Sequence, residues 1–156
     1  MTRKEAAGVF EVSLPTIKRW LRRRRETGEL APKAYNYIGY MWIDRDMNLD
    51  EAGEMIKKAL DAEPDNGAFL DSLGWLHYKK GDYEQALKDL LRAVESLKKE
   101  DPVVFEHLGD TYHKLGKEAE ALSYWQRSLA LEDNPKVKEK IEALRPTVGS
   151  GAAAPQ

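Results

Sequence analysis

The stretch LDSLGWLH at residues 70–77 decides the fold, because the chain holds a counterpart on each side of it. It aligns with YNYIGYMW at residues 35–42 and with FEHLGDTY at residues 105–112, so that Gly39, Gly74 and Gly109 are 35 residues apart. Each glycine is followed by a second segment in which small and large residues recur in register. These residues are Ala52, Ala86 and Ala121, then Ile56, Leu90 and Trp125, and then Ala59, Ala93 and Ser128. A fixed period of this length predicts stacked helix pairs whose small residues let two backbones approach closely.

This pattern closely resembles the tetratricopeptide-repeat (TPR) family, with one residue more than the usual period of about 34. The resemblance implies an all-α fold, a TPR superhelix (α-solenoid) of three helix-turn-helix repeats. Apolar Val137, Ile141 and Leu144 in an otherwise charged helix suit a cap that covers the last repeat. We place the repeats at residues 33–66, 67–101 and 102–134, the capping helix at 135–145 and a flexible tail, rich in small residues, at 146–156.

In the TPR family the first helices of the repeats line a concave groove that binds peptides or helices. On this chain the resemblance gives ten groove candidates: Asn36, Tyr40, Asp71, Trp75, Tyr78, Lys79, Glu106, Asp110, His113 and Lys114. Asp44 continues the face of Asn36 and Tyr40. Members that hold a partner's C-terminal carboxylate use Lys, Arg and Asn at matching places. The acidic residues here favour a basic or amphipathic protein segment instead, with Tyr40 and Trp75 as anchors. The alternative is that the aromatic residues pack between repeats and the acids form a solvated face.

The N-terminal segment, residues 1–32, follows a different pattern. Residues 1–33 have a net charge of +5, and the rest of the chain has −7. Ser13 would cap a helix that Gly28 ends. The segment resembles part of the helix-turn-helix of transposases and related DNA-binding proteins through RKEAA (3–7), FEVS (10–13), TIKRWL (16–21) and RETG (25–28). The resemblance implies DNA contacts from Ser13, Leu14, Thr16, Lys18, Arg19 and Arg22.

Two features of this segment depart from that motif. Glu11 takes the place of the usual turn glycine, and the helix that should precede the motif is absent. We therefore expect the apolar residues of the hairpin, Trp20 among them, to pack on Tyr35, Ile38 and Trp42. The hairpin would then extend the repeat array, and the chain would be a protein-binding scaffold. The rival hypotheses are a DNA-binding regulator whose repeats bind a partner or dimerise, and a chimera or designed protein without a natural ligand. Exposed apolar surface would also allow a homodimer.

Several classes of function find no support in the sequence. The chain has no cysteine, and His107 and His113 lack the i, i+4 spacing that places two metal ligands on one helical face. No arrangement of acids, bases and nucleophiles stands out, which predicts a protein that is not an enzyme and needs no cofactor or metal. No apolar run approaches the roughly 20 residues that span a membrane, and no signal segment is recognisable. The cytoplasm is the expected location.

Overall fold

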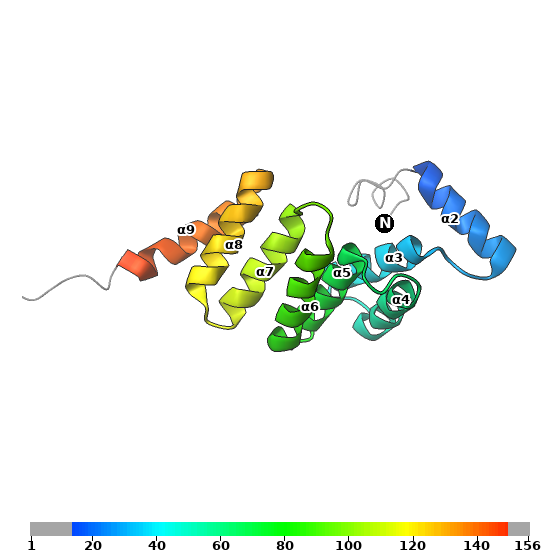
Figure 1. The fold of residues 1–156 in the computed structure, drawn as a ribbon, viewed down its shortest axis with the longest axis horizontal. Coiled ribbons are helices and arrows are strands. Elements are labelled where there is room, and N and C mark those ends of the chain that lie inside the picture. The colour runs from blue at the N-terminus through cyan, green and yellow to red at the C-terminus, as the bar shows by residue number, and fades with distance from the viewer. Residues whose placement is uncertain (1–13, 150–156) are drawn as a thin grey trace, which may run out of the picture.

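The computed structural model describes residues 14–149, and within that range it contains helices and turns only. Figure 1 shows α3 to α9 stacked one after another along the long axis, with α2 beside α3 at one end and α9 at the other. The expected all-α fold is confirmed. The helices are α2 (Leu14–Thr27), α3 (Pro32–Asp44), α4 (Leu49–Ala62), α5 (Gly67–Lys79), α6 (Tyr83–Ser96), α7 (Pro102–Lys114), α8 (Glu118–Leu131) and α9 (Pro135–Gly149). The part of the predicted hairpin that precedes Leu14 lies outside the described residues.

Consecutive helices pair as α3 with α4, α5 with α6 and α7 with α8, and the repeating glycines lie at the crossings. A Cβ atom on Gly74 would lie 2.6 Å from Leu90 Cγ and 3.2 Å from the carbonyl oxygen of Ala86. One on Gly39 would meet Ile56 in the same way. The register read from the glycines therefore reflects close approach of two helix backbones, which only a residue without a side chain permits.

The turns inside the pairs require a left-handed residue at one position. Gly81 and Gly116 have φ values of 84° and 73° in the turns after α5 and α7. In the first pair Asp46 takes the equivalent position with φ of 53°, although a side chain is less favourable there than hydrogen. The first helices of the second and third pairs begin at side-chain caps. Asn66 and Asp101 accept hydrogen bonds from the first N–H groups of α5 and α7.

The core is a chain of clusters between neighbouring helices. Ile43 and Ile56 lie in the first, Leu70, Leu90 and Phe105 in the second, and all are almost fully buried. In the third, α9 covers α8 with three buried residues. They are Val137, Ile141 and Leu144. The helix runs past residue 145 to Gly149, so the segment expected to be a tail begins as helix. Each pair therefore depends on the neighbour that covers it.

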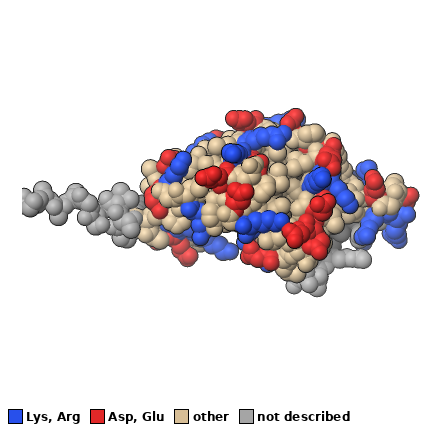
Figure 2. Space-filling model, turned by 90° about the horizontal axis from the view of Figure 1, so that it is seen from below, with Lys and Arg blue, Asp and Glu red and all other residues tan. Residues whose placement is uncertain are grey.

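Charges are distributed unevenly over this row of helices. In Figure 2 Lys and Arg gather at the end of the molecule that α2 occupies, while both signs are interspersed over the remaining surface of that face. None of the helices within residues 14–149 is long and apolar enough to cross a membrane. The clearest concentration of one charge on this face is therefore the basic helix α2, and the surface beside it carries both signs.

Candidate functional site

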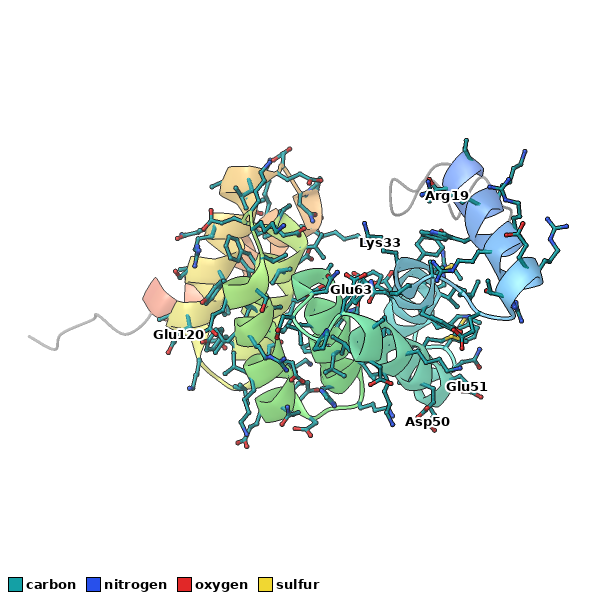
Figure 3. All side chains as sticks on the ribbon, turned by 45° about the vertical axis from the view of Figure 1, so that its right-hand side comes forward. Arg19, Lys33, Asp50, Glu51, Glu63 and Glu120 are labelled. Carbon is teal, nitrogen blue, oxygen red and sulfur yellow. The ribbon has the colours of Figure 1, made fainter. Side chains whose placement is uncertain are left out.

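A groove of about 920 Å³ opens on the face formed by α3, α5 and the start of α7, and α2 closes one side of it. We call it the α3 groove. Trp20 and Tyr37 contribute aromatic surface to its wall, with ring centroids 5.7 Å apart. Arg19 of α2 and Lys33 of α3 lie on the same side of the molecule in Figure 3, and both line the groove. The groove therefore has an aromatic wall and a basic rim on the side of α2.

One stripe of α3 faces this groove. Asn36, Tyr40 and Asp44 follow one another at intervals of four residues and all three line it. The side-chain oxygen Oδ1 of Asn36 is buried and has no hydrogen-bond partner among the described residues. A buried acceptor without a donor is unfavourable by about 1–3 kcal/mol, so a ligand donor would be bound favourably if the half-buried Asn36 side chain turned its oxygen into the groove that it lines.

The opposite wall comes from the beginning of α5 and α7. Phe69 and Val104 are buried and supply apolar floor, and Val103 is 42% exposed. Ser72 also lines the groove, and its hydroxyl donates to the carbonyl oxygen of Ala68 at 3.1 Å. Four of these lining residues, Phe69, Ser72, Val103 and Val104, were absent from the sequence prediction. The repeat alignment could have indicated Ser72. It takes the position that His107 holds one repeat later, and a side chain so much smaller leaves space at that position.

The acidic candidate Asp71 lies at the edge of the groove and is paired within the protein. Its Oδ1 lies 2.9 Å from Nδ1 of His107, and both residues are buried. Nε2 of the same histidine is 3.4 Å from the Tyr40 hydroxyl, and the imidazole stacks on Trp75 with centroids 4.0 Å apart. Burial alone would lower the pKa of His107, but the carboxylates of Asp71, Asp110 and Glu106 raise it above its usual value. The imidazolium form is thereby favoured.

The acidic candidates Glu106 and Asp110 are also paired, with a lysine from α9. Lys140 Nζ lies 2.7 Å from Glu106 Oε1 and 2.8 Å from both carboxylate oxygens of Asp110. Asp110 accepts a further hydrogen bond from Trp125 Nε1 at 2.9 Å. Burial acts to lower the pKa of Lys140, but the two carboxylates raise it overall. These acids therefore join α7 to α9 and are not part of a free acidic surface.

Trp75 was predicted as an exposed anchor, and this part of the prediction is wrong. The side chain is only 8% exposed, because it is stacked between His107 and Tyr78. Burial, and then the charge of Asp110, raises the pKa of Tyr78 to about 12. Lys79 bonds to Asp46 at 3.0 Å and lies over the Trp75 ring. These aromatic side chains pack between helices, as the alternative interpretation stated.

The last two groove candidates lie at the end of α7. His113 and Lys114 are both exposed, and His113 bonds to Glu118 at 2.8 Å. Neither lines the α3 groove. Of the ten candidates the structure therefore brings Asn36, Tyr40 and Asp71 together in it, and the other seven lie elsewhere. Their role as ligand contacts stays a prediction.

The helix predicted to contact DNA is α2, and some of its proposed DNA-contacting side chains face the α3 groove. Thr16 and Arg19 line the groove, whereas Lys18 and Arg22 are exposed elsewhere on α2. Ser13 lies outside the described residues, and so does the side chain of Leu14. The ring contact of Trp20 is with Tyr37, a residue absent from the set on which it was expected to pack. Within the described residues no group of His, Asp and Glu side chains could hold a metal ion.

Comparison with known proteins gives a family match over most of the chain. The model described as "Tetratricopeptide repeat" matches residues 11–137, and it therefore includes α2. A TPR repeat-containing protein of Pseudomonas aeruginosa, PA4667, is 39% identical over 77 residues, which is 49% of this chain and 13% of the relative. The chain spans between 13% and 33% of the length of the four curated relatives it matches.

Solved structures share the fold over longer stretches. A thermophilic TPR protein of Thermus thermophilus, TTC0263, has a TM-score of 0.70 and 20% identity, and the match covers 94% of this chain and 78% of that one. The TPR2AB domain of yeast Sti1 in complex with pHSP90 has a TM-score of 0.63 and 25% identity, with coverage of 75% and 47%. The single family match across residues 11–137 gives no support to a helix-turn-helix unit or to a chimera joined near residue 32.

Proposed function

Because this chain belongs to the tetratricopeptide-repeat family, we propose that it is a non-enzymatic protein-interaction scaffold that binds a peptide or helix of a partner in the α3 groove. The observation that carries the proposal is the open groove of about 920 Å³, which joins an aromatic wall to a buried, unpartnered acceptor at Asn36. Grooves that combine apolar surface with a few polar groups suit a protein segment. The TPR2AB domain of yeast Sti1, which has a similar fold, was solved in a complex with pHSP90, and this supports a protein or peptide as the partner.

The groove favours an amphipathic segment. Phe69 and Val104 form its apolar floor and Tyr37 its wall, and these surfaces would take the apolar side of the ligand. Its polar side would face the rim at Arg19 and Asp44. Glu106 and Asp110, which suggested a basic partner from sequence, are neutralised by Lys140 and contribute little to this preference. We keep the cytoplasm as the proposed compartment.

The test is selection of peptides from a random 12-residue phage library against the whole chain. Peptides that bind should lose at least ten-fold in affinity on Ala68→Trp, since Ala68 is exposed at the second position of α5 and lines the groove. Ala119→Trp is the matched control, because Ala119 is exposed at the second position of α8 and does not line the groove. Equal binding by both variants, or no enrichment of any peptide, would refute the proposal.

DNA binding through α2 and self-association are less well supported. The groove-facing positions of Thr16 and Arg19 remove two of the six proposed DNA contacts from the outer surface. Among the side chains that the structure describes, the large apolar residues that are exposed are Met47 in the turn after α3, Val103 on α7 and Leu131 on α8, so they are far apart in the sequence. Titration of a labelled duplex at low and moderate salt separates the two uses of α2. Binding that Lys18→Ala and Arg22→Ala abolish would establish a DNA site.

A further inference from the structure

The helices α5, α7 and α9 are joined on the groove side by a repeated polar contact. At the step from α5 to α7, His107 bonds to Asp71. At the step from α7 to α9, Lys140 bonds to Glu106 and Asp110. Asp71 and Glu106 are 35 residues apart and take the same position in their repeats. In both steps a basic side chain from the following helix therefore satisfies an acceptor on the preceding one.

The step from α3 to α5 lacks this basic side chain. Asn36 is one period before Asp71 and offers the acceptor, but the position of His107 is held by Ser72. The Ser72 hydroxyl is short and donates to the carbonyl oxygen of Ala68, within its own helix. Asn36 Oδ1 is left buried without a donor. Both residues line the α3 groove, so part of its volume is the space that a longer side chain fills in the later steps.

The charges around this space favour a cation. Burial, followed by the charges of Asp71, Asp44, Glu106 and Asp101, raises the pKa of Tyr40 far above its ordinary value. Of these four acids, Asp71 is paired with His107 and Glu106 with Lys140, so the negative charge left at the groove is that of Asp44 and Asp101. Asp44 is exposed on the same stripe of α3, and no hydrogen bond or ion pair to it is recorded among the described residues. Arg19 and Lys33 are exposed on the rim, so water and salt screen their charge, as they screen that of Asp44.

We propose that the α3 groove takes a lysine or arginine side chain of the partner segment, with its cationic head at Asn36 Oδ1, Tyr40 and Asp44. Between α3 and α5 this side chain would make the contact that His107 makes between α5 and α7 and that Lys140 makes between α7 and α9. Its aliphatic part lies along the apolar floor at Phe69, as long cationic side chains do when only their head is polar. The inference rests on the proposed function and adds the chemistry of the ligand. It also argues against an acidic C-terminal tail as the preferred ligand of this groove.

The experiment uses the peptides that the phage selection enriches and that Ala68→Trp excludes. The expected result is a Lys or Arg at one fixed place in the aligned peptides, and at least ten-fold weaker binding when that residue is replaced by Met. On the protein, Asp44→Lys should weaken binding of the Lys-containing peptide about ten-fold and leave the affinity for its Met variant unchanged. Asp61→Lys is the control for total charge, because Asp61 is exposed on α4 and does not line the groove.

Variants of Asn36 test the acceptor itself. Asn36→Asp keeps the oxygen and adds charge, and should tighten binding of the Lys-containing peptide several-fold. Asn36→Leu removes the acceptor and should weaken it at least ten-fold, with an unchanged circular dichroism spectrum as evidence of folding. Groove-binding peptides without a shared Lys or Arg, or equal effects of Asp44→Lys and Asp61→Lys, would overturn this inference and leave the proposed function standing. No groove-dependent peptide at all would overturn both.

Discussion

At the scale of single residues, His107 links the groove to the core behind it. It bonds to Asp71, stacks on Trp75 and lies within 3.4 Å of the Tyr40 hydroxyl. A buried imidazole that is held by a carboxylate is stable mainly in its protonated form, because the charge of Asp71 offsets the loss of hydration. Stability should therefore depend on pH through this residue.

We expect the free energy of unfolding to fall as pH rises, because the protonated His107 stabilises the folded chain. The variant His107→Gln should lose this pH dependence. The pKa of His107 is raised above 6.5 in the folded chain, so the folded state holds the proton more tightly than the unfolded state does. The stabilisation is complete below about pH 6.5 and is lost as pH rises through the folded pKa. Urea unfolding of both chains between pH 6 and pH 9 measures the difference. Parallel pH profiles would contradict the prediction.

Gly74 should tolerate no side chain. Gly74→Ala should destabilise the chain by about 1–3 kcal/mol, because the new Cβ would lie 2.6 Å from the fully buried Leu90. Gly53→Ala is a matched control within α4, where the nearest atom is Leu76 Cδ2 at 3.3 Å and the gain in helix propensity is up to about 1 kcal/mol. Thermal and urea unfolding measure both variants. Equal destabilisation would show that the spacing of the glycines does not reflect helix crossing.

The glycine register was sufficient to predict the helix pairs, since it depends on contacts between adjacent segments. The chemistry of the groove was harder to predict. The sequence suggests a free acidic surface at Asp71 and Glu106, but their partners His107 and Lys140 lie on the next helix but one, 36 and 34 residues away. Side-chain pairing across that distance depends on how two repeats are rotated against each other, which no local pattern contains. The burial of Trp75 could not be predicted for the same reason, because it stacks on His107 of the next repeat.

At the scale of helices, α9 contributes both buried side chains and ion pairs to the last repeat. It buries Val137, Ile141 and Leu144 and brings the ammonium of Lys140 to two carboxylates of α7. Without it Trp125 would be open to water and both acids would lose the ammonium that pairs with them. The helix is therefore a structural part of the last repeat.

Removal of residues 135–156 should destabilise the remaining chain by at least about 2 kcal/mol, since each of the three buried side chains contributes roughly 1.5–3 kcal/mol before ordering is subtracted. Urea unfolding and binding of the dye ANS to newly exposed apolar surface measure the effect. Lys138→Ala is the control on the intact helix, because the ion pair between Lys138 and Asp133 is exposed and contributes at most about 1 kcal/mol. An unchanged unfolding midpoint after truncation would contradict the assignment of α9 as a cap.

At the scale of the whole molecule, each pair of helices packs only on its neighbours, so stability need not be uniform along the row. The core clusters of α5 to α8 are covered on both sides, whereas α2, whose Trp20 contacts the ring of Tyr37, packs on the array less closely than α3 to α9 pack on one another. Its last turn is basic, and a helix of 14 residues is marginal in water without tertiary support. The end that carries the α3 groove should therefore open more readily than the centre.

The four tryptophans can test this directly, because they stand in α2, α3, α5 and α8 as Trp20, Trp42, Trp75 and Trp125. Biosynthetic labelling with 5-fluorotryptophan gives each its own fluorine resonance, assigned by single Trp→Phe variants. In a urea titration the Trp20 signal should reach its unfolded position at lower urea than Trp75 and Trp125, with Trp42 between them. A groove-bound peptide should raise the midpoints of Trp20 and Trp42 most, since it joins α2 and α3 to α5. Coincident transitions of all four would show that α2 and the first repeat fold in one cooperative unit with the rest.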